Sequence, residues 1–176
     1  MLCYFCGLPK CGKSLLAERW LAERGGRVLY VGTLPDIRIY RETIRLHRER
    51  RPEDWDLYEC TGEPLQDMAW LDGALERYDG VLLDGPSFYL QRALCYYEIG
   101  WMEVRALRRL LKKAAALPVR CCLVDQPLAG AQGEIRTVGR IFHEAVYRYA
   151  GARLYVEDGA AVSCPVGALR QFDGGG

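Results

Sequence analysis

An eight-residue segment near the start of the chain constrains the fold most strongly. It matches the pattern G-x-x-x-x-G-K-[ST] and follows directly on the apolar run Leu2–Cys6, which predicts a buried strand. Ser14–Arg24 comes next, with apolar residues at helical spacing and Gly25 just beyond its end. The match therefore lies between a strand and a helix, where this pattern forms a phosphate-binding loop. Its members are Gly7, Leu8, Pro9, Lys10, Cys11, Gly12, Lys13 and Ser14.

This loop predicts binding of a nucleoside triphosphate, GTP or ATP, together with Mg²⁺. Gly7 and Gly12 permit a tight turn in which backbone N–H groups surround phosphate oxygens, and the following helix directs its positive end at them. We expect Lys13 to contact the β- and γ-phosphates in catalysis and the Ser14 hydroxyl to bind the metal ion. A chance glycine turn is the alternative, and the strand and helix around the segment argue against it.

A second acidic residue is expected at the end of a neighbouring apolar strand, where it would hold Mg²⁺ through water. The run Gly80–Asp84 is such a strand, and we assign Asp84 a metal-binding and catalytic role. The alternative is an ordinary strand-ending aspartate that caps the turn before Gly85 and Pro86.

Strand-like apolar runs alternate with segments of helical period along the chain. This alternation predicts an α/β fold in which helices flank a mainly parallel sheet, of the P-loop NTPase-like (RecA-like) kind. After the first strand, the expected strands are Arg27–Thr33, Leu57–Cys60, Gly80–Asp84, Val119–Val124 and Leu154–Val156. After the first helix, the expected helices are Asp36–Arg50, Leu65–Arg77, Met102–Ala116 and Ile135–Tyr149.

Length and charge limit the classes of function. The 176 residues suit a single nucleotide-binding domain, residues 1–172, and residues 173–176 are expected to form a disordered tail. Lys and Arg number 24 against 23 Asp and Glu, so the balance does not favour nonspecific binding to nucleic acid, and we expect no nucleic-acid partner. The sequence has no apolar run long enough to span a membrane and no signal peptide, so the expected location is the cytoplasm.

The positions of the 8 cysteines favour reduced core thiols over a disulfide framework. Cys3, Cys6, Cys121 and Cys122 fall in apolar runs that predict buried strands. Cys3 and Cys6 form a C-x-x-C pair, but residues three apart on a strand point to opposite faces, which is poor geometry for a metal site. A zinc or redox role is therefore the weaker interpretation.

The segment between the second expected strand and Pro52 is rich in arginine and contains His47, one of 2 histidines. A solvated, charged helix face is one explanation. In the other, some arginines offset triphosphate charge and His47 is a nucleophile that forms a phosphoramidate with a nucleotide. The second histidine, His143, lies in an expected helix, and we expect it at the surface. The arginines of the segment are Arg38, Arg41, Arg45, Arg48, Arg50 and Arg51.

Over roughly Met1 to Leu94, the chain resembles the adenosylcobinamide kinase / adenosylcobinamide-phosphate guanylyltransferase family. The loop opens the chain, RVLYVGT resembles the family's second strand, and LLDGPSFYLQRAL resembles its apolar-acid segment, with Asp84 at the acidic position. The family's histidine segment reads His, three residues, Arg-Pro, two residues, Trp. The matching residues here are His47, Arg51, Pro52 and Trp55, Glu59 falls where the family has a glutamate, and Ser87 falls where a hydroxyl residue is usual.

The resemblance implies a bifunctional enzyme of cobalamin nucleotide-loop assembly. In this family the loop binds the nucleotide, GTP guanylylates a histidine with release of pyrophosphate, and the GMP passes to adenosylcobinamide phosphate. By this resemblance His47 carries the nucleotide, and Thr33, Arg51 and Glu59 contribute to nucleotide binding. GTP or ATP and a corrinoid are then the substrates, and a homo-oligomer is the expected assembly.

The sequence also departs from the family. Its loop reads Leu-Pro-Lys-Cys where the family has an Arg and a Ser, and Arg92 stands where the family has an asparagine. After Val124 the family has an Asn-Glu-Val-Gly turn, whereas this chain reads DQPLAG over residues 125–130, and a later Asn-Gln pair is missing near Ala150. Two alternatives therefore stay open: a P-loop kinase of another small metabolite without a covalent nucleotide, and a non-catalytic GTP-binding relative.

Overall fold

Unbroken apolar runs form the central strands of the sheet, as expected for strands covered on both faces. The computed structural model describes all residues except 35, 37, 88, 91–100, 127–132 and 164–176. Within these residues, seven strands lie in the order β3-β2-β4-β5-β1-β6-β7. Neighbours pair in parallel except β6 and β7. The strands are β1 Leu2–Cys6, β2 Val28–Gly32, β3 Asp56–Glu59, β4 Gly80–Asp84, β5 Arg120–Asp125, β6 Ala152–Glu157 and β7 Ala160–Ser163.

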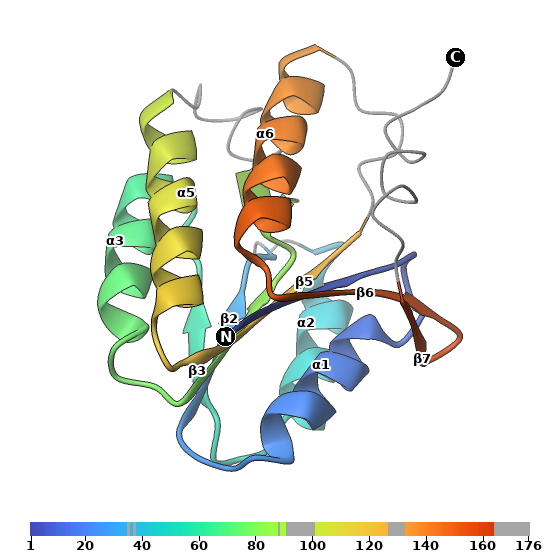
Figure 1. Cartoon of the computed structure of the whole chain (residues 1–176). Coiled ribbons are helices and arrows are strands. Elements are labelled where there is room, and N and C mark those ends of the chain that lie inside the picture. The colour runs from blue at the N-terminus through green and yellow to red at the C-terminus, as the bar shows by residue number, and fades with distance from the viewer. Residues whose placement is uncertain (35, 37, 88, 91–100, 127–132, 164–176) are drawn as a thin grey trace.

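Helices cover both faces of the sheet (Figure 1). On one face α3, α5 and α6 pack over a large apolar core, and on the other face α1 packs over a smaller one beside α2. Cys3 faces the smaller core and Cys6 the larger, so the C-x-x-C pair does point to opposite faces. The helices are α1 Lys13–Ala22, α2 Arg41–Arg50, α3 Pro64–Ala74, α5 Trp101–Ala116 and α6 Gly133–Tyr149.

The α/β fold with a mainly parallel sheet is confirmed, and the differences lie at the ends of elements. The expected helix Asp36–Arg50 begins only at Arg41, because residues 38–40 form a turn. The strand β7 was not predicted. The sequence feature that indicates it is the pair Asp158-Gly159, which is typical of a tight hairpin turn. Their φ angles of 47° and 78° place both residues in the left-handed region that this turn requires.

His143 lies inside α6 and is half-buried, so the expected surface position is wrong. Its ring makes edge contacts with Tyr4 and Phe142, at centroid distances of 6.2 and 5.7 Å. The reason is that the apolar stripe of α6 packs on the sheet and carries its neighbours inward. The expectations for Arg92, for residues 127–130 and for the tail 173–176 fall outside the described residues.

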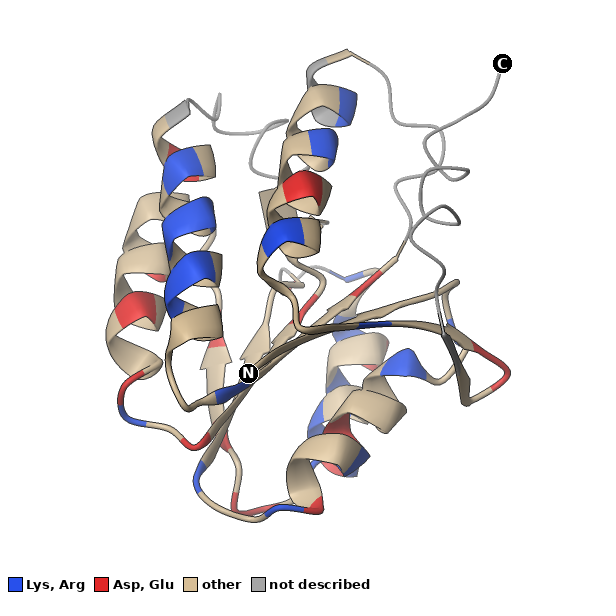
Figure 2. Cartoon of the chain, in the orientation of Figure 1, with Lys and Arg blue, Asp and Glu red and all other residues tan. Residues whose placement is uncertain are grey.

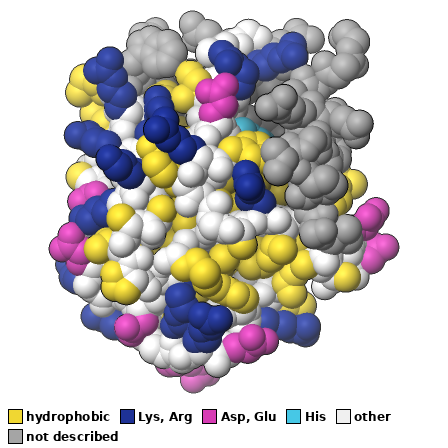
Figure 3. All heavy atoms as spheres, viewed as in Figure 1, with side chains coloured by type: hydrophobic (Ala, Val, Ile, Leu, Met, Phe, Trp, Pro, Cys, Tyr) yellow, Lys and Arg dark blue, Asp and Glu magenta, His cyan; other side chains and the backbone are white. Residues whose placement is uncertain are grey.

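Charges of both signs are spread over the described surface (Figures 2 and 3). The clearest basic group lies on α5, where four residues line a shallow groove beside Leu65, Met102 and Tyr149. Those four residues are Arg105, Arg108, Arg109 and Lys112. No helix in the described part of the chain is both long enough and apolar enough to cross a membrane.

Candidate active site

The loop after β1 has the left-handed backbone that a phosphate-binding turn needs. Lys10 has a φ of 65° and Gly12 a φ of 89°, and Gly12 leads directly into α1 at Lys13. Gly7 has no room for a side chain, since a Cβ there would lie 2.5 Å from the Val156 carbonyl oxygen. The loop therefore aims the N-terminus of α1 at the space above the sheet, where the helix dipole favours an anion.

The β6–β7 turn supports this loop from behind. The Gly159 N–H donates to the Cys11 carbonyl at 2.8 Å, and a Cβ on Gly12 would lie 3.0 Å from the Gly159 Cα. The hairpin that the sequence did not predict thus fixes the position of the predicted loop. Lys13 folds back, with its Nζ donating to the Leu8 carbonyl at 3.0 Å.

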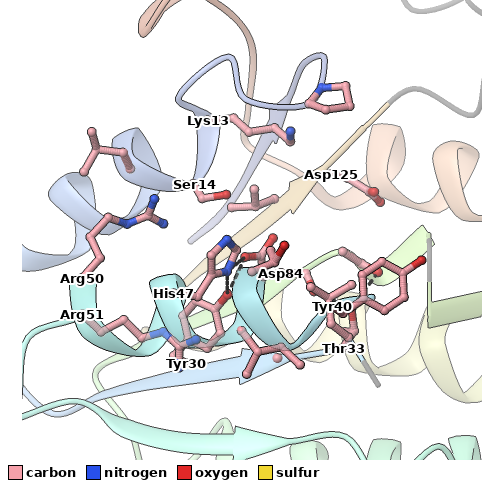
Figure 4. A pocket seen from close by; sticks show the side chains of 18 of the residues that line it. Lys13, Ser14, Tyr30, Thr33, Tyr40, His47, Arg50, Arg51, Asp84 and Asp125 are labelled. Atoms are coloured by element: carbon pink, nitrogen blue, oxygen red, sulfur yellow. Dashed lines mark hydrogen bonds and ion pairs between the residues drawn. The ribbon is translucent and has the colours of Figure 1, made fainter. Parts of the chain in front are cut away.

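A cavity of about 650 Å³ opens beside the loop, at the carboxyl ends of the parallel strands (Figure 4). Ligands of open parallel sheets bind in this position, and the volume is typical of small-molecule sites. The cavity brings together most of the residues that the sequence predicted. Those that line it are Pro9, Lys10, Gly12, Lys13, Ser14, Thr33, His47, Arg51, Glu59 and Asp84.

Three predicted loop residues, Gly7, Leu8 and Cys11, shape the loop without lining the cavity. Thr33 lines it but also has a structural role. Its buried hydroxyl lies within hydrogen-bonding distance of the carbonyl oxygens of Asp84, at 2.6 Å, and Gly85, at 3.1 Å. Thr33 therefore ties the end of β2 to the end of β4 and holds Asp84 at the rim of the cavity.

One side of α2 forms the wall opposite the loop. Residues at helical spacing on this side line the cavity, although α2 has no buried residue. A two-pronged ion pair anchors the helix: the Arg50 guanidinium donates to both carboxylate oxygens of Glu18 on α1, at 2.7 and 3.0 Å. The lining residues of this segment are Thr43, Ile44, His47, Arg50 and Arg51.

His47, Tyr30 and Asp84 form a hydrogen-bonded chain in the cavity (Figure 4). The Tyr30 hydroxyl donates to Asp84 Oδ2 at 2.5 Å and lies 3.0 Å from His47 Nδ1. His47 Nδ1 is also 3.4 Å from Asp84 Oδ2. The three side chains come from α2, β2 and β4, so only the folded chain assembles them.

The arginine-rich segment divides into surface and cavity residues. Arg41, Arg45 and Arg48 form ion pairs with nearby carboxylates at exposed positions, which agrees with a solvated helix face. Arg51 instead lies in the cavity, with its guanidinium 3.4 Å from the centre of the Tyr30 ring, and burial lowers the pKa of Arg51. The solvated-face interpretation therefore holds for Arg41, Arg45 and Arg48, whereas a role of Arg51 and His47 in nucleotide chemistry stays a prediction.

Asp125 is a cavity residue that the sequence analysis did not select. Its buried carboxylate accepts the Ser87 hydroxyl at 2.5 Å, the Ser87 N–H at 2.9 Å and the Gln126 N–H at 2.8 Å. Burial raises the pKa of Asp125 to about 7, because these hydrogen bonds offset only part of the desolvation. The sequence feature that could have identified Asp125 is the one that identified Asp84, an aspartate at the end of an apolar strand.

The oxygen donors in the cavity suit Mg²⁺. The Ser14 hydroxyl and the Asp84 carboxylate both line it. Among the described residues no group of three or more His, Cys, Asp or Glu side chains could hold a metal ion by itself. A site with few protein ligands fits Mg²⁺ bound to a nucleotide, because that ion takes its other ligands from phosphate and water.

Comparison with known families also indicates an enzyme that uses a nucleotide. The family model described as cobinamide kinase / cobinamide phosphate guanyltransferase matches residues 3–152. The match includes the loop, Tyr30, His47, Asp84 and Asp125, and it ends at the first residue of β6. A search of curated protein sequences finds no match to the chain.

Proposed function

The chain belongs to the cobinamide kinase / cobinamide phosphate guanyltransferase family, and we propose that the one cavity beside the phosphate-binding loop serves both activities. Kinase and guanylyltransferase activity in cobalamin synthesis follow from the family. The assignment of individual residues is our proposal. It rests on one observation above all: His47 lies in the same cavity as Lys13, Ser14 and Asp84.

In this proposal the loop residues 7–14 bind the triphosphate through backbone N–H groups and the N-terminus of α1. Lys13 leaves the Leu8 carbonyl and contacts the β- and γ-phosphates. Ser14 and Asp84 would hold Mg²⁺, and the ion would supply positive charge that offsets the charge of the phosphates. Thr33, Arg51 and Glu59 border the nucleotide.

His47 is the nucleophile of the nucleotidyl transfer. Its ring nitrogen attacks the α-phosphorus of GTP, the bond to the β-phosphate oxygen breaks, and pyrophosphate leaves with the electron pair. A phosphate oxygen of cobinamide phosphate then attacks the same phosphorus, and the electron pair of the P–N bond returns to the ring. The positive charge of Arg51 offsets the charge that develops on the phosphate.

The remaining parts of the proposal concern the setting of the enzyme. GTP is the nucleotide for the guanylyl transfer, and GTP or ATP serves the kinase reaction. We propose that residues 1–172 act as one domain and that the chain assembles as a homo-oligomer in the cytoplasm. The family name is the support for the guanine nucleotide and the corrinoid acceptor.

The test is covalent labelling of the purified protein with Mg²⁺ and GTP carrying label on the α- or the γ-phosphate. We expect label on the intact chain from α-labelled GTP only, with release of pyrophosphate and loss of label in acid. Addition of cobinamide phosphate should remove the label and produce a guanylylated corrinoid.

Two histidine variants locate the label. His47→Ala should lose it completely, whereas His143→Gln should keep it, because His143 lies in α6 outside the cavity. The chain has 2 histidines, so this pair decides between them. Label that persists in His47→Ala would refute the assignment. Binding of GTP without any label in the wild type would favour a non-catalytic relative, and phosphoryl transfer alone would favour a simpler kinase.

A further inference from the structure

The chemistry of His47 depends on which ring nitrogen carries the proton. A neutral imidazole has one N–H and one nitrogen with a free electron pair, and only the latter can attack phosphorus. The hydrogen bond at one nitrogen decides which tautomer is present. The nucleophilic nitrogen of His47 is therefore set by the partners of Nδ1.

The distances between the polar atoms of Asp84, Tyr30 and His47 show which group donates each hydrogen bond. The Tyr30 and Asp84 oxygens are 2.5 Å apart, which requires a proton between them, and a phenol supplies it because a carboxylate is the far weaker base. The Tyr30 hydroxyl is therefore the donor in this contact and the Asp84 carboxylate the acceptor. The phenol oxygen can then only accept from His47 Nδ1, 3.0 Å away.

We propose that Tyr30 is a positioning residue that holds the proton of His47 on Nδ1 and so leaves Nε2 free as the nucleophile. This inference rests on the proposed role of His47 in nucleotidyl transfer. Both acceptors near Nδ1, the Tyr30 hydroxyl at 3.0 Å and Asp84 Oδ2 at 3.4 Å, favour the same tautomer.

The same chain stabilises the charge that forms in the reaction. When Nε2 bonds to phosphorus and pyrophosphate leaves, the ring holds both the Nε2–P bond and the Nδ1–H and carries one positive charge. The Asp84 carboxylate faces that charge directly and through the Tyr30 hydroxyl. When the acceptor takes the nucleotide, the electron pair returns to Nε2 and the neutral Nδ1–H tautomer is restored.

The Tyr30 ring is itself held in place. The Tyr30 side chain is almost fully buried in the smaller core, and the Arg51 guanidinium stacks 3.4 Å from its ring centre. A rigid phenol fixes the direction of the hydrogen bond, and α2 brings His47 to it.

Tyr30→Phe tests the proposal because it removes only the hydroxyl. The rate of labelling from α-labelled GTP should fall roughly ten- to hundredfold, by analogy with the loss of a hydrogen-bond partner that orients a metal-binding histidine. Label should remain on His47, and the KM for GTP should change less than kcat. A rate equal to that of the wild type would overturn the proposal.

Tyr58→Phe is the matched control. Tyr58 also donates its hydroxyl to an aspartate, Asp67, at 2.7 Å, but it lies outside the cavity on β3. Its labelling rate should equal that of the wild type. An equal loss in both variants would show that any tyrosine hydroxyl of this sheet affects the rate through packing, and would also overturn the proposal.

A second readout reports the tautomer without any reaction. In protein with ¹⁵N-labelled histidine, NMR at alkaline pH should show His47 protonated on Nδ1 in the wild type and shifted toward the Nε2–H form in Tyr30→Phe. His143→Gln assigns the signals. An Nε2–H tautomer in the wild type would refute the proposal for Tyr30, whereas absence of label in the wild type would refute the nucleophile role of His47 and leave this measurement intact.

Discussion

The floor and the wall of the cavity are built in different ways. The floor consists of the ends of β1, β2, β4 and β5, strands whose residues are almost all buried, and of the more exposed phosphate-binding loop that follows β1. The wall is α2, which has no buried residue and is anchored by polar contacts to α1, β2 and β4. Core packing therefore fixes the groups that bind phosphate, whereas a few ion pairs and hydrogen bonds fix the proposed nucleophile.

This difference predicts that changes in the floor affect both reactions and changes in the wall mainly the nucleotidyl transfer. In the proposed function both reactions need the triphosphate on the loop, but only the nucleotidyl transfer needs the His47 ring in position to attack phosphorus. The variants below test that division from the largest expected effect to the smallest.

Lys13→Ala should have the largest effect, because it removes a cation from the floor. We expect both phosphoryl transfer and covalent labelling to fall roughly 10²–10³-fold, as when one preorganised charge-stabilising group is removed. The fold should persist, because within the described residues the Lys13 ammonium makes one hydrogen bond, to the Leu8 carbonyl of its own loop. Assays of both activities and the thermal midpoint measure this, with the exposed Lys112→Ala on α5 as control. Near-normal kinase activity in Lys13→Ala would contradict the role of the loop.

Arg50→Met should have the next largest effect, because it detaches the wall. Glu18 is left buried on α1 without its partner, which costs roughly 1–3 kcal/mol at a partly buried site. We expect labelling of His47 to fall more than tenfold, with a smaller loss of kinase activity.

Arg48→Met on the same helix is the control for Arg50→Met. Its ion pair with Glu59 on β3 is exposed on both sides and holds α2 less strongly than the Arg50–Glu18 pair does, so labelling should fall much less than in Arg50→Met. If Arg50→Met reduces the two activities equally, the wall does not act separately from the floor, and the comparison fails.

Asp125→Asn tests how the buried carboxyl of Asp125, in the floor, makes the stability of the protein depend on pH. The folded protein keeps the proton on this carboxyl up to about pH 7, while the unfolded chain loses it near pH 4. In that window the folded state binds more protons, so this group makes the protein less stable as pH rises from 4 to 7. An asparagine cannot ionise and removes this dependence, but its amide cannot accept both Ser87 donors.

The prediction for Asp125→Asn is therefore a change with pH in the stability difference between the two proteins. Relative to the wild type, the variant should be less stable at pH 5 and should gain stability by pH 8. Urea midpoints at both values measure this, and contributions common to both proteins cancel. A stability difference that does not change with pH would show that Asp125 is already ionised at pH 5.

The sequence predicted the floor better than the wall for a physical reason. A phosphate-binding loop is specified by local backbone requirements, so Gly7, Gly12 and Lys13 are visible as a motif with a strand before it and a helix after it. Asp84 was visible for a similar reason, at the end of an apolar strand. Asp125 had the same signal, but no motif distinguished it from an ordinary strand end.

The contacts of the wall had no local signal. Tyr30 is 17 residues from His47 and 54 from Asp84 in the chain, and it looked like one more apolar residue of a strand. Arg50 and Glu18 are 32 residues apart, and nothing in either segment marks them as partners. The resemblance to a family identified His47, but only the fold shows what holds its ring.

The smallest effect is expected for Arg45→Ala, on the solvent side of the wall. Arg45 pairs with Glu42 and Glu49 along the same helix at exposed positions, where water and salt screen the charges. These contacts join α2 to itself and not to the floor. Labelling of His47 and the thermal midpoint should therefore match the wild type at both low and high salt. A loss of labelling in Arg45→Ala as large as that in Arg50→Met would show that ion pairs within α2 position His47, and that the Arg50–Glu18 pair has no special role in holding the wall.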